Sequence, residues 1–295
     1  MPRNIRHLLF FRVSYKMTAR FDMGLSRGVE ETSKAQFNFP GGMVGPLSYI
    51  GGKNRLANRL IEIFPEHTTY VEAFAGGAQV LFHKEPSKVE VINDLDGEVV
   101  NFFRVCQQHH EELVRYLHFG LVSRKWFELL KATDPASLTD IQRAARYFYL
   151  LKNSFASIVR NPNYHWHVVQ PPGFNLERLP ELLEKTHQRL ERVQIEHLPY
   201  EKMLARYDRS ATFFYLDPPY WGKKLYRHNF TTEDFVNLEE RLRKVKGKFM
   251  LSLNDVPEVR ALFKHFHIQE IELHYSSQKH AGRRHVEVVI TNFRA

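Results

Sequence analysis

The sequence predicts an α/β fold, with a mostly parallel, about seven-stranded sheet covered by helices and interrupted by a mainly helical insertion. Three observations support this prediction. Short runs rich in β-branched and aromatic residues recur along the chain, and several are almost continuously apolar, as in strands covered on both faces. Helical stretches separate most of these runs, which favours right-handed crossovers between parallel strands. One long interval contains no convincing strand.

Composition limits the class of protein. The chain has 295 residues and is 43% hydrophobic, which suffices for one large domain or two smaller ones. Its 42 Lys and Arg exceed its 33 Asp and Glu, and the formal charge of +9 suits a polyanionic partner or a merely basic soluble protein. The single cysteine, Cys106, excludes a disulfide framework and a cysteine metal cluster and favours a reducing compartment. No apolar run is long enough to span a bilayer.

Residues 1–44 differ from the rest of the chain. They hold seven Lys or Arg and three Asp or Glu, and their apolar run Leu8–Phe11 is too short for a secretory signal core. An Arg-rich start is typical of organelle transit peptides, but serines are few here. We expect a disordered extension or an over-long start, with Met17, Met23 and Met43 as alternative starts, and no role in the fold.

Hydrophobic spacing and turn residues predict the elements in order. A Gly-Gly turn at residues 51–52 opens a helix with apolar residues at helical spacing, and Pro65 ends it. Further helices are predicted over residues 234–245 and 257–266. The predicted strands are Thr69–Phe74, Val89–Ile92, Val193–Leu198, Thr212–Leu216, Phe249–Leu253, Ile268–Tyr275 and Val286–Asn292.

The interval without strands, residues 103–192, is predicted as a helical insertion into a sheet domain formed by residues 45–102 and 193–295. One of its helices places six apolar residues on one face: Ile141, Ala144, Ala145, Phe148, Leu151 and Phe155. A similar pattern spans residues 176–193. The loop over residues 160–175, rich in aromatic residues, His, Asn and Pro, is a candidate reading surface, although long loops are often only connections.

Ligand-type residues follow two predicted strands. The strand that ends at Phe74 runs into a Gly76-Gly77 turn, and ligands bind at such strand ends because glycine lets the backbone approach them. The turn lacks the G-x-G-x-x-G spacing, so a dinucleotide fingerprint is not supported. Asp94 ends the next strand, where a carboxylate can accept hydrogen bonds from ribose hydroxyls. Alternatively, Asn93 or Asp94 caps the following helix.

A third strand ends in FFYLDPPYWG, residues 213–222. Two prolines stop a sheet ladder and stiffen the backbone, so Asp217 and Tyr220 are presented in a fixed geometry. This suits a rigid structural turn or a site that holds a flat group. If the three strands are neighbours, Gly76, Asp94 and Asp217 converge on one cleft, with an adenosine-like cofactor beside the first two.

The ordered set of YIGGK, VEAFAGGA, INDLD and DPPY resembles the Dam-like DNA adenine-N6 methyltransferases from about Pro46 to Phe293. LLKNSFASIVR, FMLSLND and RRHVEVVITNF are similar to further motifs of that family, whereas tetrapeptides related to DPPY alone also occur in RNA and protein amide methyltransferases. The resemblance implies a Rossmann-like class I methyltransferase fold and S-adenosylmethionine as cofactor. It also implies a target-recognition domain between the second strand and the DPPY strand.

The resemblance also implies roles for single residues. The implied cofactor-binding residues are Tyr49, Lys53, Phe74, Gly76, Gly77, Asp94 and Asp217, with Asp94 on the ribose and Tyr49 where the family often has tryptophan. The implied catalytic residues are Asp217, Pro218, Pro219 and Tyr220. Asp217 and the Pro218 carbonyl would accept hydrogen bonds from the target amine, and Tyr220 would stack on a flipped adenine.

This chemistry explains the tetrapeptide. The exocyclic amine of adenine is a poor nucleophile because its lone pair is delocalised into the ring. Two acceptors draw the amine toward tetrahedral geometry and localise that pair. Positioning therefore accounts for much of the reduction in the barrier to methyl transfer. Because a duplex shields the target atom, the base must be flipped out and held by stacking.

Other reactive residue types do not indicate a second chemistry. Cys106 does not lie at the catalytic strand end that a cytosine-C5 methyltransferase needs, so we expect a buried thiol. The histidine pairs lack a supporting carboxylate or cysteine pattern, and we expect no metal site. The pairs are His109/His110, His165/His167 and His265/His267.

The expected DNA contacts lie outside the cofactor pocket. Lys223, Lys224 and Arg227 follow DPPY, where a loop can bind phosphates beside the flipped base. Further basic candidates are Arg124, Lys125, Lys152, Arg160, Arg283 and Arg284, although solvated surface charge is the alternative for any one of them. Base reading is expected from the loops of the insertion, at Asn161, Asn163, Tyr164 and His165.

The sequence therefore predicts a site-specific adenine-N6 methyltransferase that acts on double-stranded DNA, as a monomer or weak dimer, with no membrane or metal partner. The expected location is the cytoplasm of a bacterial or virus-infected bacterial cell. Two alternatives stay open. One is an enzyme that methylates adenine in RNA or another planar amide, and the other is a catalytically silent DNA-binding protein. The large insertion favours duplex DNA, and the intact Asp217 and Tyr220 argue against the silent protein.

Overall fold

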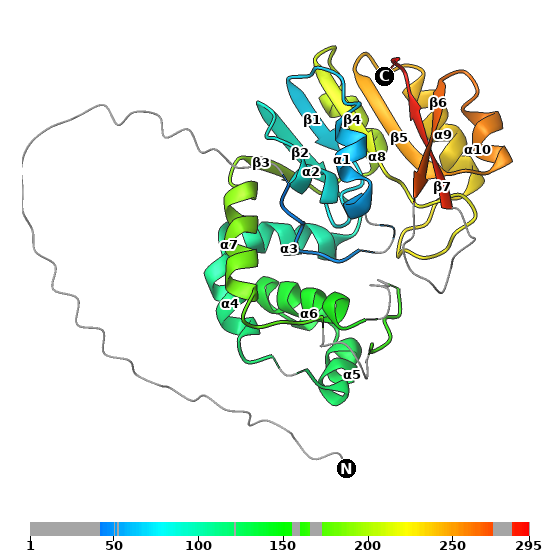
Figure 1. Ribbon diagram of the computed structural model, residues 1–295. Helices are drawn as coiled ribbons and strands as arrows, with labels where there is room; N and C mark the ends of the chain where they lie inside the picture. The colour runs from blue at the N-terminus through cyan, green and yellow to red at the C-terminus, as the bar shows by residue number, and fades with distance from the viewer. Residues whose placement is uncertain are drawn as a thin grey trace, which may run out of the picture. The chain divides into compact units, whose positions relative to one another are not determined.

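A seven-stranded sheet runs through the described part of the chain (Figure 1). The computed structural model describes residues 42–49, 51, 53–120, 122–154, 160–165, 173–273 and 285–294. The strands are β1 (Thr69–Glu72), β2 (Val89–Asn93), β3 (Val193–Glu196), β4 (Thr212–Leu216), β5 (Lys248–Asn254), β6 (His267–Leu273) and β7 (His285–Thr291). Their order across the sheet is β3-β2-β1-β4-β5-β7-β6.

All strand pairs from β3 to β5 are parallel, and β7 runs antiparallel to both of its neighbours. In the register, Thr69 of β1 lies opposite Val89 of β2 and Thr212 of β4. The strands that end at the glycine turn, at Asp94 and at the DPPY motif are therefore neighbours. The predicted fold class, an α/β fold with a mostly parallel seven-stranded sheet, is confirmed.

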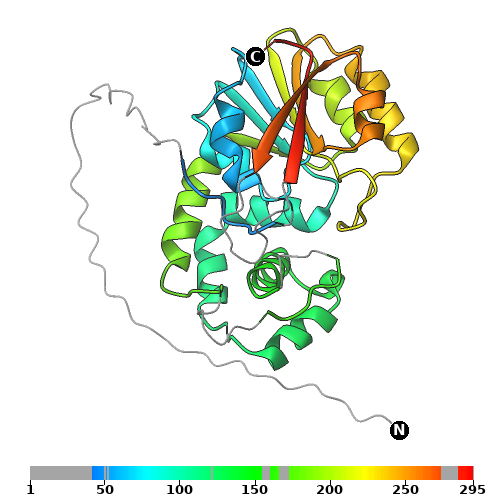
Figure 2. The same cartoon turned by 45° about the vertical axis from the view of Figure 1, so that its right-hand side comes forward.

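Apolar side chains on both faces explain why the strands are nearly continuous hydrophobic runs. In β4, Phe213 and Tyr215 face one apolar cluster, and Phe214 and Leu216 face the other. The first cluster includes α1 (Ala57–Ile61), α2 (Gln79–His83) and α3 (Gly97–Gln108). The second includes α8 (Tyr200–Tyr207), α9 (Thr232–Leu242) and α10 (Pro257–Leu262), and Figure 2 shows helices on both sides of the sheet.

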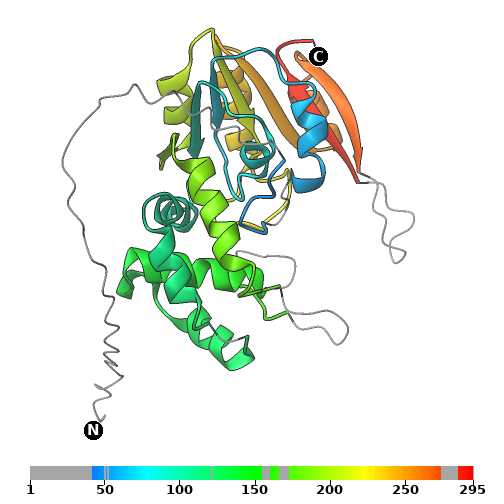
Figure 3. The same ribbon diagram turned by 60° about the vertical axis from the view of Figure 1, so that its left-hand side comes forward.

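The described residues between α3 and β3 are helical. They form α4 (His110–Leu117), α5 (Arg124–Ala132), the 3-10 turn η2 (Pro135–Ser137), α6 (Asp140–Lys152) and α7 (Leu179–Leu190), with an isolated bridge between Ser154 and Tyr164. A reciprocal Thr139–Gln142 capping box starts α6. Figures 1 and 3 show these helices gathered beside the sheet, with α7 leading back to it.

The helical segment and the sheet share one apolar cluster, because α3 packs against both α6 and α7. Residues 39–295 form one compact unit. Since α3 spans residue 102, it crosses the predicted boundary between sheet domain and insertion. The two boundaries of the insertion stay a prediction.

A buried ion-pair network ties α7 to the sheet. Arg189 donates to both carboxylate oxygens of Glu90, at 2.5 and 3.0 Å, and to the Leu81 carbonyl at 2.8 Å. Lys84 pairs with the same carboxylate, and Arg189, Glu90 and Lys84 are all buried. Removing one member of such a network leaves an unpaired buried charge, which costs about 3–5 kcal/mol.

Element ends differ from the predictions by a few residues. Helix α9 ends at Leu242 rather than Val245, because the following backbone turns to donate to Asp208: Lys246 N and Gly247 N lie 2.8 and 2.9 Å from its Oδ1. The predicted first helix is divided into a 3-10 turn, η1 (Lys53–Arg55), and the short α1. Phe155, Tyr275 and residues 1–41 lie outside the described residues.

Candidate active site

The carboxyl ends of β1, β2 and β4 meet at a cavity of about 250 Å³. Its lining includes every residue predicted to bind cofactor: Tyr49, Lys53, Phe74, Gly76, Gly77, Asp94 and Asp217. Of the predicted catalytic residues, Asp217 and Pro219 line the cavity and Pro218 is buried next to them. Tyr220 is connected to the cavity through a hydrogen bond to Lys53.

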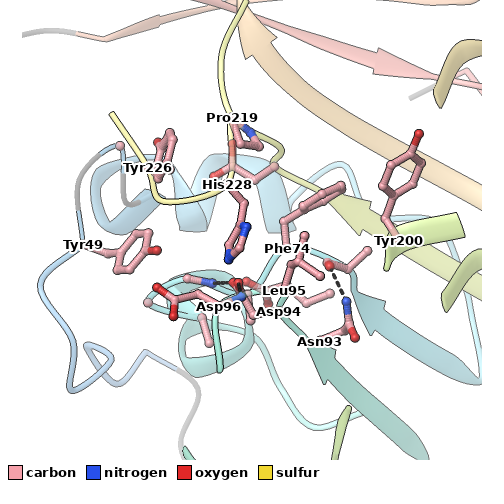
Figure 4. Close-up of a pocket in the computed structure, with 18 of the residues that line it drawn as sticks. Tyr49, Phe74, Asn93, Asp94, Leu95, Asp96, Tyr200, Pro219, Tyr226 and His228 are labelled. Carbon is pink, nitrogen blue, oxygen red and sulfur yellow. Dashed lines mark hydrogen bonds between the residues drawn. The ribbon is translucent and has the colours of Figure 1, made fainter. Parts of the chain in front are cut away.

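Aromatic rings form two walls of this cavity (Figure 4). Tyr49 and Tyr226 stack at one side, with ring centres 6.2 Å apart and ring planes 20° from parallel. Phe74 and Tyr200 lie at the other side, with ring centres 5.7 Å apart. Asp94 lies between the two walls in Figure 4. The cavity therefore combines apolar sides with a carboxylate, which suits a flat ligand that carries hydroxyl or amine groups.

The glycine turn after β1 packs closely against Tyr49. Gly76 has a φ of +47°, and an added Cβ would lie 2.9 Å from the Tyr49 ring. At Gly77, an added Cβ would lie 3.0 Å from the Leu47 carbonyl oxygen. Backbone conformation and space both require glycine at position 76. Its N–H donates to Asp94 Oδ2 at 2.8 Å, so the turn also fixes the carboxylate.

Backbone donors hold Asp94. Its Oδ2 accepts from Gly76 N and its Oδ1 from Asp96 N, both at 2.8 Å. Asp96 is the N-cap of α3 and accepts from Glu98 N, so the alternative that Asn93 or Asp94 caps this helix is wrong. Burial raises the pKa of Asp94 to about 6, although both N–H donors lower it.

A buried ammonium joins the residues of the DPPY turn. Lys53 Nζ donates to Asp217 Oδ1 and to the Tyr220 hydroxyl, both at 2.7 Å. The same nitrogen lies 4.9 Å from the centre of the Tyr220 ring and 3.5 Å from Glu287 Oε2. We call Lys53, Asp217, Tyr220 and Glu287 the clamp. Lys53 therefore contacts the proposed catalytic side chains as well as the cavity.

The clamp is charged at neutral pH. Burial lowers the pKa of Lys53, but the facing Asp217, Tyr220 and Glu287 side chains outweigh it and hold the pKa well above its usual value. Burial raises the pKa of Asp217 to about 6, against the effect of Lys53. At pH 7, Lys53 is thus an ammonium and Asp217 a carboxylate.

An asparagine on β5 fixes the backbone after the DPPY turn. Asn254 Oδ1 accepts from Trp221 N at 2.9 Å, and Asn254 Nδ2 donates to the Trp221 carbonyl at 3.3 Å. Asn254 belongs to the FMLSLND stretch and is the last residue of its strand. The paired bonds hold the chain directly after Tyr220 in one orientation.

The structure brings together three of the residues predicted to contact DNA. Arg160, Asn161 and Arg227 line a second cavity, of about 290 Å³, with Lys131 and Arg146. Arg227 also lines the first cavity, where its Nη1 lies 3.3 Å from Asp96 Oδ1. The two cavities therefore share one arginine side chain.

The other predicted DNA-binding residues that the structure describes are not among those that line the second cavity. Lys223, Lys224 and Asn163 are exposed. The Arg124 guanidinium lies 5.1 Å from the ring centre of Tyr164, and the Lys152 ammonium 5.4 Å from that of Phe148. Arg283, Arg284 and His167 lie outside the described residues.

Sequence analysis misses several residues of the site. Glu287 belongs to a mostly apolar strand that is buried from Glu287 to Thr291, and an acid within such a run is the signal that could have identified it. Tyr226 carries no such signal, because its contact with Tyr49 joins distant segments. Arg146 lies within the apolar stretch of α6, where a buried arginine is unusual.

Three further findings concern Cys106, metal-ligating side chains and membrane-spanning helices. Cys106 is fully buried, as expected, and burial raises the pKa of its thiol. Within the described ranges, no three His, Cys, Asp or Glu side chains are grouped so that they could hold a metal ion. Among the same residues, no helix has the length and apolar character needed to cross a bilayer.

Comparisons with known proteins identify relatives over most of the chain. The profile of the D12 class N6 adenine-specific DNA methyltransferase family matches residues 49–277. The type II methyltransferase M1.LlaDCHI of Lactococcus lactis subsp. cremoris is 28% identical over 268 residues, 83% of this chain and 94% of that protein. The type II methyltransferase M.CviBI of Paramecium bursaria Chlorella virus NC1A is 25% identical over 256 residues, 83% of this chain and 96% of that protein.

The family match includes both walls of the cavity, the glycine turn, Asp94 and the DPPY turn. It extends through the helical segment and covers more than half of the chain. The cavity at the strand ends and the clamp beside it are both what an adenine methyltransferase of this family needs. The chain belongs to the D12 class N6 adenine-specific DNA methyltransferases and is a DNA adenine-N6 methyltransferase.

Proposed function

We propose that this methyltransferase takes its methyl group from S-adenosylmethionine and delivers it to the N6 amine of an adenine flipped out of duplex DNA. The observation that carries the proposal is the clamp, in which Lys53 holds Asp217 and Tyr220 beside a cavity between strand ends. A carboxylate and an aromatic ring fixed at one wall suit a planar base with an exocyclic amine.

The residues of the cavity fit the proposed cofactor. Gly76 leaves room for backbone approach, since an added Cβ would meet the Tyr49 ring. We assign Asp94 to the ribose hydroxyls, because its carboxylate is fixed by backbone donors at the end of β2. Tyr49, Phe74 and Gly77 would line the same site, and Lys53 and Asp217 would face its reactive end.

The chain's own contribution to the reaction is to orient the target amine. When bound, S-adenosylmethionine supplies an electrophilic methyl group on a positively charged sulfur. Lys53 occupies Asp217 Oδ1, and among the described residues none donates to Oδ2, so Oδ2 is the oxygen for the amine. We assign the Pro218 carbonyl as the second acceptor, and the Pro218-Pro219 backbone keeps both acceptors in place.

Asp217 also suits the proton that leaves N6. A methylated exocyclic amine that still carries both protons is a strong acid, so a nearby carboxylate accepts one of them at Oδ2. With a pKa of about 6, Asp217 then releases the proton to water at neutral pH. Tyr220 holds the base by stacking, and its bond to Lys53 sets the orientation of the ring.

We propose that residues 103–192 form the target-recognition domain and that DNA phosphates bind along Lys223, Lys224 and the second cavity. Arg146 supports this use of the second cavity: it is 7% exposed, and its Nη1 has no hydrogen-bond partner. A guanidinium so placed favours an anionic ligand. The other proposed DNA contacts are Arg124, Lys152, Arg160, Arg227 and Asn163.

Transfer of labelled methyl from S-adenosylmethionine to unmethylated duplex DNA, followed by nucleoside analysis, tests the proposal. We expect the label in N6-methyladenine, and single-molecule sequencing of the product then gives the recognition sequence. RNA of the same sequence is the matched control substrate. Label on RNA alone, or no measurable binding of S-adenosylmethionine, would contradict the proposal.

A further inference from the structure

One member of the clamp, Glu287, is assigned no role in the proposed methyl transfer. Glu287 of β7 is 9% exposed and lies outside the segment matched by the family profile. The buried Ser252 hydroxyl donates to Glu287 Oε2 at 3.1 Å, and Lys53 Nζ lies 3.5 Å from the same oxygen. A buried carboxylate is costly unless it is paired, so its position facing Lys53 requires a reason.

The clamp contains two carboxylates for one ammonium, since Asp217 and Glu287 both face Lys53. Glu72 also lines the cavity, but burial raises its pKa to about 8, and it is therefore mostly uncharged at pH 7. Lys53 neutralises one of the two negative charges. One excess negative charge is left at this end of the cavity.

Positioning alone does not require the second carboxylate. Asp217 and the Tyr220 hydroxyl already accept two of the three ammonium protons at 2.7 Å, and the Gly51 carbonyl lies 3.3 Å from Lys53 Nζ. The Glu287 contact is longer, at 3.5 Å, and adds charge more than geometry. Ser252 fixes that charge at a defined distance from Lys53.

We propose that Glu287 acts through Lys53 and gives the clamp its excess negative charge, so that the site favours a cationic methyl donor over the neutral product of methyl transfer. The inference rests on the proposed function, because S-adenosylmethionine carries a sulfonium charge and S-adenosylhomocysteine does not. It assigns to the end of the chain a part in discrimination between donor and product.

The charge changes of the reaction match this arrangement. The N6 lone pair forms the new N–C bond, the C–S bond breaks with its electron pair on sulfur, and a proton leaves N6 through Asp217 Oδ2. Positive charge thus passes from sulfur to nitrogen and leaves as a proton. A fixed negative excess beside this path stabilises each of these cationic stages.

The test is the ratio of two dissociation constants, measured by calorimetry on the full chain at pH 7. In Glu287→Gln, whose side chain has the same shape without charge, we expect affinity for S-adenosylmethionine to fall about tenfold and affinity for S-adenosylhomocysteine to change little. Glu287→Met, a second neutral variant of similar volume, should give the same change in the ratio. Glu287→Asp should restore the ratio, because it keeps the charge.

Ser252→Ala is the matched control, because it removes the hydrogen bond to Glu287 and leaves every charge in place. We expect its ratio to stay near that of the unchanged chain. Equal losses for both ligands in the neutral variants would show a merely structural role and overturn the inference, as would an unchanged ratio. If the unchanged chain binds neither ligand, the proposed cofactor itself is wrong, and that outcome is distinct from the other two.

Discussion

Two aspartates follow the strands on either side of β1 and line the same cavity, but the chain holds them differently. Asp94 accepts two hydrogen bonds from backbone N–H groups, whereas Asp217 accepts one from the Lys53 ammonium. Burial raises the pKa of each to about 6. The two carboxylates have similar pKa values but different partners, and they therefore suit different tasks. Asp94, fixed by backbone donors, suits ligand binding. Asp217, with a charged partner on one oxygen only, suits a role in the reaction.

The largest effect is expected at the reactive aspartate. Asp217→Ala removes the proposed acceptor of the target amine and should lower single-turnover methyl transfer about 10³-fold, the loss typical of a deleted stabilising group. Affinity for S-adenosylhomocysteine, which carries no sulfonium charge, should change by less than about threefold, because Asp94 and its donors are untouched. Rapid-quench label transfer and calorimetry measure the two quantities. Normal turnover in this variant would refute the catalytic assignment of Asp217.

A smaller loss of transfer rate is expected when Asp217 is kept and its partner Lys53 is removed. Lys53→Met leaves Asp217 and Tyr220 without their shared donor, and a misplaced acceptor should slow single-turnover transfer about 10²-fold. The buried carboxylates also become unpaired, so the melting temperature should fall. If Lys53→Met transfers methyl as fast as the unchanged chain, Asp217 acts without help from Lys53, and the proposed positioning role of Lys53 is wrong.

The opposite pattern is expected at the other aspartate. Asp94→Asn keeps the side-chain shape but weakens the charge-assisted bonds proposed with the ribose, so cofactor dissociation should increase about 10–100-fold. At saturating cofactor, single-turnover transfer should stay within about threefold of the unchanged chain. Asp217→Asn is the matched control: transfer should slow, and affinity for the uncharged S-adenosylhomocysteine should change little. If both variants lose rate and affinity together, the proposed division of tasks between Asp94 and Asp217 is wrong.

The smallest expected effect is the pH dependence that Asp94 and Asp217 give to cofactor binding and to the rate of transfer. Protonation of Asp217 removes its acceptor, so single-turnover transfer should fall as the pH drops through about 6, by up to tenfold per unit. Affinity for S-adenosylhomocysteine, which carries no sulfonium charge, should weaken in the same window through Asp94. In Asp94→Asn that affinity should lose its pH dependence while the rate keeps it. A flat rate profile between pH 5 and pH 8 would count against the assignment of Asp217.

The same raised pKa values determine how these groups affect stability. Because the folded values of about 6 lie above the ordinary value of 3.8, the folded chain binds protons more readily than the unfolded chain. The resulting contribution to stability is fully present below pH of about 4 and is lost as the pH rises through about 6. Both aspartates therefore lower the free energy of unfolding at pH 7.

Much of the fold is predictable from the sequence, because parallel strands covered on both faces are continuous apolar runs. β4 begins and ends at the predicted residues, and the strand ends that carry Gly76, Asp94 and Asp217 converge as expected. Helix ends were less accurate: the turn after α9 depends on Asp208, which is distant in sequence and cannot be identified from local spacing.

The clamp is the part of the site that sequence patterns could not provide. The family resemblance implies that Lys53 contacts the cofactor, but Lys53 also donates to Asp217, 164 residues away. Glu287 and Ser252 approach Lys53 through the antiparallel pairing of β7 with β5, which depends on strand order. Motifs thus predict which strand ends carry the site, while contacts between distant segments decide the partners of each side chain.

The network of Arg189, Glu90 and Lys84 has a consequence for exchanging parts between related enzymes. Arg189 is on α7, the last helix before the chain returns to the sheet, whereas Glu90, with which Lys84 also pairs, lies on β2. A hybrid that takes its helices from another enzyme but loses this arginine would leave Glu90 with one partner fewer. Hybrids joined before residue 179 keep Arg189 and therefore the native ion pair with Glu90.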